Sequence, residues 1–383
     1  MLSRPHRAGI DESAFIEGEP YALAFSGGGD SLALLARLKS DPLLRGVLHV
    51  DHGLRDNSDQ EAERARKLAA KLDRAVSVLR WEHDGVETRI QERAREARYA
   101  LMGAWCRAKG ITQLVTAHHA DDQAETVQMR IARGSGWRGA SGMRPRAYAP
   151  VWPALAGVTL VRPALGLSRE ALRRSLGKLR PMEDPSNENA DFQRIRVRRE
   201  LADDPERRAV LLSLADKMAA GRETERARLR DVLEGHTMTH EGQLSLATLA
   251  PLDALSTLVP IVGGQQGPVD RSRLRAARET LLEGAPIALG CGTIGEWDGA
   301  RLLLSRDPVA MSGRRDGGLT ATAVRTDIKP DPVVWDGRFL VSGRSGVINP
   351  ERRGRHVGFR ILFGRDVRVH NLVAERIAHA AVT

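Results

Sequence analysis

A glycine-rich turn near the N-terminus constrains the fold of this chain more than any other segment. It consists of Ser26, Gly27, Gly28, Gly29, Asp30 and Ser31, between the apolar residues 21–25 and 32–35. Because glycine has no Cβ and can adopt positive φ, its backbone N–H groups can approach an anion closely, and the positive end of a following helix adds to the attraction. The pattern therefore predicts a buried strand, a phosphate-binding loop and a helix. It lacks the lysine of the common nucleotide-binding P-loop.

Length and composition favour a globular protein of two or three domains, since 383 residues exceed one average domain. No apolar run approaches 18 residues, and no apolar segment follows the first residues, so we expect neither a membrane span nor a signal peptide, and a cytoplasmic location. The two cysteines, Cys106 and Cys291, form no C-x-x-C pattern, which argues against a disulfide framework and a zinc ribbon.

The charge balance points to a polyanionic partner. The net charge is +10, and residues 130–200 hold 15 lysines and arginines against 6 acids. Cations near phosphates release condensed counterions on binding, so nucleic acid is the expected partner. Arginine used simply for solubility is the alternative, but the clustering disfavours it.

Short apolar runs alternate with helical patterns through the first half of the chain. The runs cover residues 21–25, 47–50, 76–79 and 114–117. This rhythm predicts an α/β fold with a parallel, doubly wound sheet, in which ligands bind at the carboxyl ends of the strands. The glycine-rich turn, Asp51 with His52, and His118 with His119 all follow such runs, so we expect them to meet in one crevice.

The rhythm changes near residue 203. Long charged helical sequence follows, and from about residue 312 short β-type runs alternate with turns rich in Gly, Arg and Asp. We predict three domains: a catalytic domain over 1–202, a mostly helical domain over 203–311 that would bind the nucleic acid, and a small basic C-terminal module over 312–383. Ser58 and Ser168 are the expected starts of two helices in the first domain.

Six segments together resemble a known family. The glycine-rich turn matches S-G-G-x-D-S, the loop of the PP-loop ATP pyrophosphatases, an adenine nucleotide alpha hydrolase-like fold. The other segments are HVDHGLR (49–55), AREARY (94–99), TAHHADDQAET (116–126), RGSG (133–136) and EDPSN (183–187). In this order they resemble tRNA(Ile)-lysidine synthetases over roughly residues 20–200, whereas the resemblance beyond residue 200 is weak.

The resemblance implies a ligase that forms a C–N bond. Such an enzyme uses ATP to adenylate the C2 oxygen of the wobble cytidine in tRNA(Ile) with a CAU anticodon, and the ε-amine of L-lysine then displaces AMP. The glycine-rich turn, residues 26–31, would bind ATP and hold the pyrophosphate. Asp30 would act through Mg²⁺, because that ion prefers oxygen ligands and substrate phosphates. A plain helix N-terminal carboxylate is the alternative for Asp30.

The lysine nucleophile needs a carboxylate that holds its ammonium and helps to remove a proton, because the free ammonium has a pKa of about 10.4. Asp122 and Glu125 are three residues apart and share one face if a helix begins there, so both can hold one ammonium. The family pattern points to the same pair. Acids that merely favour a helix N-terminus are the alternative.

The resemblance also places His118 near the phosphates or the transferring group, and Arg98 against charge that develops on the α-phosphate. A surface role is the alternative for Arg98. A metal site of His118 and His119 with the nearby acids is disfavoured, because no cysteine or ligand from another segment joins them.

Two further segments bear on RNA binding. Residues 134–139 fit G-x-G-x-x-G but follow a predicted helix, so we interpret them as a loop and not as a dinucleotide site. Arg194, Arg196 and Arg198 alternate with apolar residues and are expected to face tRNA phosphates, with a solvated charged face as the alternative. Ile195 stands where the family tends to have Asn.

Two rival classes of function are compatible with parts of the sequence. A tRNA thiolase needs paired thiols, which Cys106 and Cys291 do not offer, and an amidotransferase-linked synthetase needs a partner domain that the sequence lacks. A basic RNA-binding protein without turnover is the other rival. The sequence leaves the oligomeric state open, with a homodimer as one option.

Overall fold

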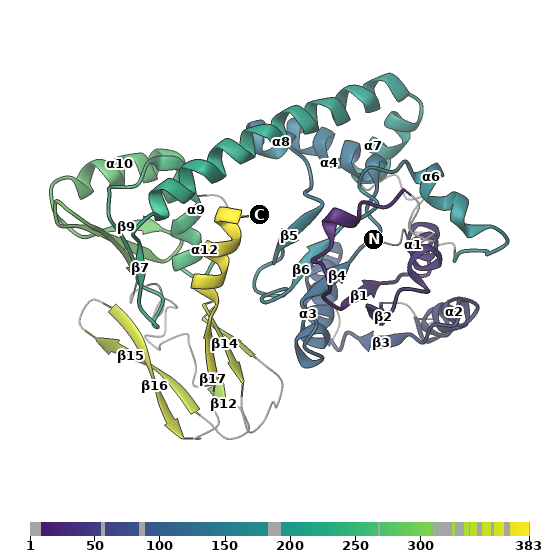
Figure 1. Ribbon diagram of the computed structural model, residues 1–383, viewed down its shortest axis with the longest axis horizontal. Coiled ribbons are helices and arrows are strands. Elements are labelled where there is room, and N and C mark those ends of the chain that lie inside the picture. Colours follow the sequence, from purple (N-terminus) through teal and green to yellow (C-terminus); the bar gives the residue numbers. More distant parts are fainter. Residues whose placement is uncertain are drawn as a thin grey trace. The chain divides into compact units, whose positions relative to one another are not determined.

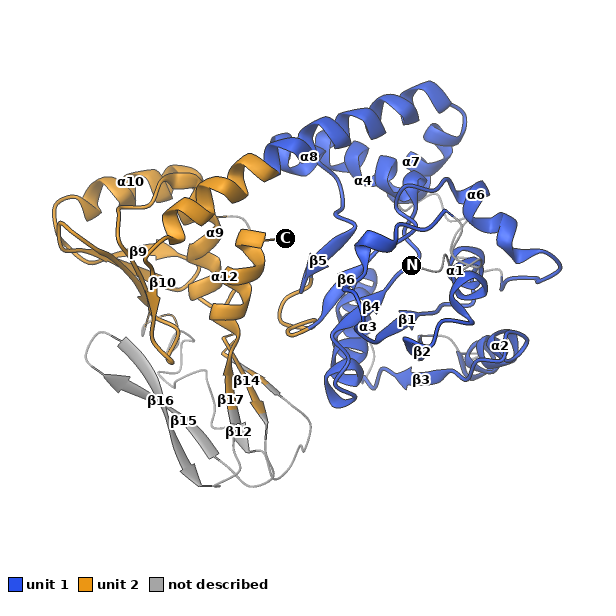
Figure 2. Ribbon diagram, in the orientation of Figure 1, with its two compact units in different colours: residues 1–150, 158–222 blue, residues 151–157, 223–383 orange. Residues whose placement is uncertain are grey.

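The computed structural model describes residues 9–54, 58–83, 89–182, 193–266, 269–307, 310, 324–325, 333–336, 338–342, 347–353, 356–363 and 368–382 (Figure 1). The chain divides into two compact units, shown in Figure 2: residues 1–150 with 158–222, and residues 151–157 with 223–383. Among the described helices, none combines the length and apolar character that crossing a membrane requires.

The first unit is built on a six-stranded sheet with the order β3-β2-β1-β4-β6-β5. All neighbours are parallel except β5 and β6. The strands are β1 (Tyr21–Ala24), β2 (Leu44–Asp51), β3 (Ser77–Arg80), β4 (Gln113–Val115), β5 (Arg146–Tyr148) and β6 (Thr159–Val161). The predicted α/β fold and its four strands are therefore confirmed.

Helices cover both faces of this sheet. The helices of this unit are α1 (Gly29–Leu38), α2 (Ser58–Ala70), α3 (Ile90–Ala108), α4 (Ala120–Ala132), α5 (Gly136–Ala140), α6 (Arg169–Arg173), α7 (Gln193–Ala202) and the first part of α8 (Pro205–Leu233), with short 3-10 turns at Glu12–Ala14 and Arg174–Leu176. Tyr21, Leu23 and Phe25 pack with residues of α1 and α2 in one apolar core. Successive strand residues point to opposite faces, and on the other face the ring of Trp105 from α3 packs where Gly46 of β2 has no side chain.

The strand order reverses at β1, which lies between β2 and β4. Ligand crevices of open α/β sheets form at the carboxyl ends of the strands beside such a reversal. The chain leaves β1 directly into residues 25–28 and α1. The topology therefore places the glycine-rich turn at this edge of the sheet.

Two predicted helix starts are confirmed. The helix α2 begins at Ser58, and the Ser168 side chain accepts a hydrogen bond from the backbone N–H of Ala171 at the start of α6.

The helices α4, α7 and α8 share a small apolar core. Ala124 and Val127 of α4 pack against Val197 and Leu201 of α7, together with Leu211 and Ala215 of α8. This apolar contact fixes α7 beside α4.

The second unit contains helices α9 (Leu252–Val262), α10 (Arg271–Leu281) and α12 (Leu372–Val382). Its antiparallel sheet has the order β7-β8-β11-β10-β9, with β7 (Thr237–Met238), β8 (Leu244–Leu246), β9 (Ile287–Gly290), β10 (Thr293–Trp297) and β11 (Leu302–Arg306). We predicted the helices here but not this sheet, whose strands are short and interleaved with helices.

The remaining strands form two small sheets, β12-β15-β16 and β13-β14-β17. Their bounds are β12 (Val324–Arg325), β13 (Val333–Trp335), β14 (Phe339–Ser342), β15 (Val347–Arg353), β16 (His356–Phe363) and β17 (Arg368–Asn371). The predicted β-type runs at 333–335 and 339–341 are thus confirmed. In the same unit, Val373 and Ile377 of α12 share one apolar core with α9 and α10.

The two compact units part within α8, whereas our predicted first boundary at residue 202 lies between α7 and α8. The division into 1–202, 203–311 and 312–383 stays a prediction. Two segments of the family resemblance reach beyond the described residues: Arg55 at the end of 49–55, and the whole of 183–187.

Candidate active site

The glycine-rich turn closes on itself through its serines. Ser26 Oγ and Ser31 Oγ lie 3.1 Å apart, Ser31 Oγ donates to the carbonyl of Gly28, and the Gly28 N–H donates to Ser26 Oγ at 3.3 Å. Gly27 has a φ of +80°, and a Cβ there would lie 2.4 Å from Met182 Sδ. Only glycine fits this position, so the sharp turn and the N-terminus of α1 at Gly29 follow from the sequence.

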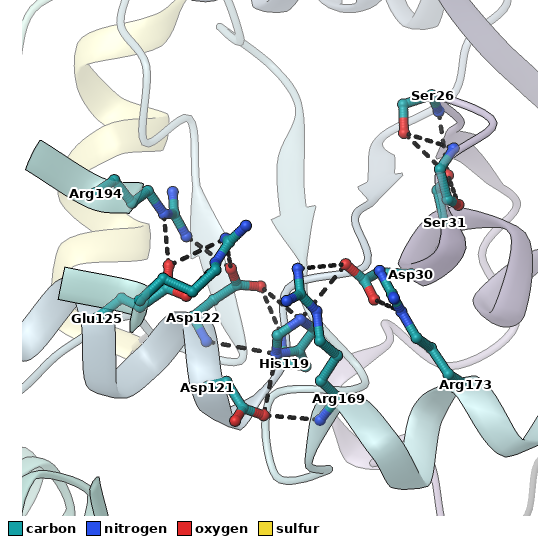
Figure 3. Close-up of polar contacts among 12 residues, drawn as sticks. Ser26, Asp30, Ser31, His119, Asp121, Asp122, Glu125, Arg169, Arg173 and Arg194 are labelled. Atoms are coloured by element: carbon teal, nitrogen blue, oxygen red, sulfur yellow. Dashed lines mark hydrogen bonds and ion pairs between the residues drawn. The ribbon is translucent and has the colours of Figure 1, made fainter. Parts of the chain in front are cut away.

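Asp30, in the first turn of α1, faces three cations or potential cations (Figure 3). Arg173 Nε lies 2.7 Å from Asp30 Oδ1, and Arg169 Nη2 and His119 Nε2 lie 3.5 and 3.6 Å from Asp30 Oδ2. Burial raises the pKa of Asp30, but the interactions with His119 and Arg173 outweigh it, so the net pKa lies well below the usual range. Asp30 is therefore ionised at neutral pH. Gly29 makes room for Arg173, because a Cβ would lie 2.7 Å from its Cζ.

A cavity of about 660 Å³ opens beside this turn. The residues that line it include Ser26, Asp30, Ser31, Asp51, His52, Arg98, His118, Asp122, Arg194 and Arg198. The expected convergence of the turn with the segments after β2 and β4 is thus confirmed. Arg98 contributes from α3, which packs across β2 and β4.

The histidines at the cavity are held neutral. Burial and the neighbouring Arg98 lower the pKa of His52 to about 4. Burial, with Arg162 and Arg194 nearby, lowers the pKa of His118 well below its usual value, and His118 Nδ1 lies 2.8 Å from Thr116 Oγ1. A neutral imidazole can accept a proton or a hydrogen bond.

Asp122 and Glu125 share one face of α4, as predicted, and they meet two arginines of α7 (Figure 3). Arg194 donates to Asp122 Oδ1 at 2.7 Å and to Glu125 Oε2 at 2.8 Å, while Arg198 Nε donates to Glu125 Oε1 at 2.7 Å. The Glu125 side chain is 2% exposed and that of Asp122 is 12% exposed. Asp122 therefore reaches the cavity, and Glu125 is engaged by both guanidinium groups.

The basic segment after residue 193 is helical, so residues four apart share a face. Arg194 and Arg198 turn toward the acids of α4, whereas Arg196 is exposed and Ile195 is buried beside the cavity. Pairing of Arg194 and Arg198 with acids was not part of our prediction.

Three cationic or potentially cationic side chains at Asp30 were missed as site residues. Arg169 and Arg173 sit on α6, and only the predicted cap at Ser168 marked that helix. We expected His119 at the crevice with His118, but assigned it no role there beyond a disfavoured metal site. We predicted a loop for residues 134–139, which is wrong for most of the segment, because residues 136–140 form the short helix α5. The segment follows α4 and not a strand, which agrees with rejecting a dinucleotide site.

A strand, a lysine-less glycine-rich turn and a helix at the reversal point of a parallel sheet define a PP-loop domain, and the family model for the PP-loop domain matches residues 11–204. A tRNA(Ile)-lysidine synthase of Hyphomonas neptunium is 38% identical over 275 residues, covering 69% of this chain and 74% of that protein. Another, of Ruegeria pomeroyi, is 34% identical and covers 84% of this chain and 76% of that protein. The chain belongs to the tRNA(Ile)-lysidine synthase family.

Among solved structures, the U34-tRNA thiolase NcsA of Methanococcus maripaludis aligns with a TM-score of 0.46 and 14% identity, over 57% of this chain and 78% of that one. This likeness is too low to bear on function.

Proposed function

We propose that this protein ligates L-lysine to C2 of the wobble cytidine in tRNA(Ile) with a CAU anticodon, with ATP as the energy source. ATP first adenylates the C2 oxygen and releases pyrophosphate, and the lysine ε-amine then displaces AMP to form lysidine. The observation that carries the proposal is the convergence of the glycine-rich turn, Asp30, His118 and Asp122 on one cavity.

The pyrophosphate side of the reaction is assigned to the turn and α1. The N–H groups of Gly27, Gly28 and Gly29, the hydroxyls of Ser26 and Ser31, and the helix N-terminus would stabilise the departing anion. Arg98 lines the same cavity and would neutralise charge on the α-phosphate. His118, neutral and hydrogen-bonded to Thr116, would orient the transferring group.

Mg²⁺ fits the chemistry of Asp30. Mg²⁺ is commonly held by one or two carboxylates and the phosphates of its substrate, and when bound it neutralises phosphate charge. Within the described residues, no cluster of three or more His, Cys, Asp or Glu side chains could hold a metal ion by itself. Substrate phosphates would therefore have to supply some of the Mg²⁺ ligands. Ionised Asp30 is the residue that would share the ion with ATP.

Lysine is assigned to Asp122 and Glu125. The ammonium would enter at Asp122, the more exposed acid, where it competes with the Arg194 guanidinium for Oδ1. Glu125 would hold Arg194 and Arg198 in place and complete the negative charge of the site. The carboxylate would also promote loss of the proton, since only about one free lysine in two thousand is neutral at pH 7.

For tRNA we assign phosphate contacts to Arg194, Arg196 and Arg198, of which Arg196 is the exposed one. Support comes from the excess of basic residues between 130 and 200. A cytoplasmic location and the option of a homodimer stay predictions from the sequence.

Incorporation of labelled lysine into a CAU-anticodon tRNA(Ile) tests the proposal. We expect incorporation that requires ATP and releases pyrophosphate and AMP, and none into a tRNA(Ile) with a GAU anticodon. Bound tRNA without pyrophosphate release would favour a binding protein. Pyrophosphate release without lysine transfer would favour another PP-loop activity.

A further inference from the structure

A fully buried histidine joins the two halves of the proposed site. His119 is 0% exposed and is the N-cap of α4. Its Nδ1 accepts a hydrogen bond from the Asp122 N–H at 3.4 Å, and the Asp122 carboxylate accepts one from the His119 N–H at 3.1 Å. One ring nitrogen is thereby committed to the helix terminus.

Among the described residues, the other ring nitrogen has no hydrogen-bond partner. His119 Nε2 lies 3.4 Å from Asp122 Oδ2 and 3.6 Å from Asp30 Oδ2. Figure 3 shows the His119 ring between these two carboxylates. Because Nδ1 accepts, a neutral ring carries its proton on Nε2. A buried donor without a partner costs about 1–3 kcal/mol, so its place between two carboxylates from distant segments asks for an explanation.

We propose that His119 is a positioning residue that sets the places of Asp30 and Asp122 with a single N–H group. This inference rests on the proposed function, in which Asp30 serves the adenylation step and Asp122 serves lysine. The same N–H can donate to either carboxylate, because it lies between them. His119 therefore sets the separation between Asp30, on the phosphate side, and Asp122, on the lysine side. A helix cap alone would use only Nδ1.

Two substitutions separate the two ring nitrogens. His119→Asn keeps a side-chain oxygen near the position of Nδ1, which preserves the cap, and leaves no donor at Nε2. His119→Gln places an amide near Nε2 and sacrifices the cap. We expect His119→Asn to melt within a few degrees of the parent and to slow both pyrophosphate release and lysine transfer from preformed adenylated tRNA at least tenfold. His119→Gln should be less stable but retain more of both rates.

Calorimetric ATP binding with Mg²⁺ supplies a readout that a cap would not move. His119→Asn should weaken ATP binding in the parent protein and have little further effect when Asp30→Asn is already present. Equal effects in both backgrounds, or parent-like rates in His119→Asn, would overturn the inference. If His119→Asn does not fold, His119→Gln decides the question. Complete loss of both pyrophosphate release and lysine transfer in a folded His119→Gln would also refute the inference, because this variant keeps an amide near the position of Nε2.

The controls keep the two proposals apart. Failure of the parent protein to incorporate lysine would refute the proposed function, and the ATP-binding cycle would still test the coupling of His119 to Asp30. Parent activity with additive binding effects would refute only the role of His119.

Discussion

At the scale of single residues, three histidines near the cavity make stability depend on pH. Burial lowers the pKa of His49, His52 and His118, to about 4 for His52. A histidine in the unfolded chain has a pKa near 6.5. At pH values between 6.5 and the lower pKa of the folded state, the unfolded chain binds more protons than the folded protein. The stability present above pH 6.5 is therefore lost as the pH falls. We expect about 1.4 kcal/mol per pH unit from His52 in this window, measured by hydrogen exchange of β1 and β2 amides between pH 7 and 5.

His52→Gln removes that titration and should flatten the dependence. His240→Gln, in the second unit, is the control and should leave the same amides unchanged. If stability changed with pH equally in the parent and in His52→Gln, the pKa of His52 would not be lowered in the folded protein.

Asp30 and Asp122 are expected to separate the two chemical steps. Asp30→Asn keeps the shape but removes the charge that faces Arg169 and Arg173, and it should abolish pyrophosphate release. Asp122→Asn should leave adenylation largely intact and slow lysine transfer at least tenfold, so adenylated tRNA accumulates. Quench experiments measure the amount of this adenylated intermediate. Equal amounts of it in both variants would contradict the assigned roles.

At the scale of elements, the contact between β2 and α3 is tight at Gly46. A Cβ there would lie 2.3 Å from the ring of Trp105, and overpacking of this kind costs about 1–3 kcal/mol. We expect Gly46→Ala to lower the urea midpoint and to weaken ATP binding, because α3 carries Arg98. Gly166→Ala is the control, since no atom of the described residues beyond its chain neighbours lies within 4 Å of its Cβ position. A decrease in the urea midpoint no larger than that of the control would mean that α3 moves aside without loss of stability.

Elements were predictable where their signals are local. Alternating apolar runs mark β1 and β2, and three successive glycines followed by an apolar helical pattern mark the turn after β1. The contact of Met182 with Gly27 is not local and was not predictable in the same way. The partners of the site acids are not local. Arg173 pairs with Asp30 across 143 residues, and Arg194 pairs with Asp122 across 72. An arginine-rich sequence offers many candidates for such pairs, and only tertiary packing of α6 and α7 selects among them.

At the scale of the whole molecule, the net charge of +10 predicts a strong salt dependence of tRNA binding. Each phosphate that a basic side chain neutralises releases condensed counterions, so the logarithm of affinity falls linearly with the logarithm of salt concentration. Filter binding between 50 and 200 mM salt should show this slope for tRNA. ATP binding, which we assign largely to the backbone N–H groups of the glycine-rich turn, should depend on salt less.

Arg196 tests whether that dependence arises at α7. Loss of one phosphate contact reduces the slope by about one and weakens binding to all tRNAs alike, because phosphate contacts do not read sequence. We expect this of Arg196→Gln, whereas Arg66→Gln, at an exposed arginine of α2 paired with Glu63, should keep the parent slope. Arg194 and Arg198 lie against Asp122 and Glu125, so their release to phosphate would leave buried acids to be compensated by the lysine ammonium. An unchanged slope in Arg196→Gln would move the phosphate-binding surface away from the exposed face of α7.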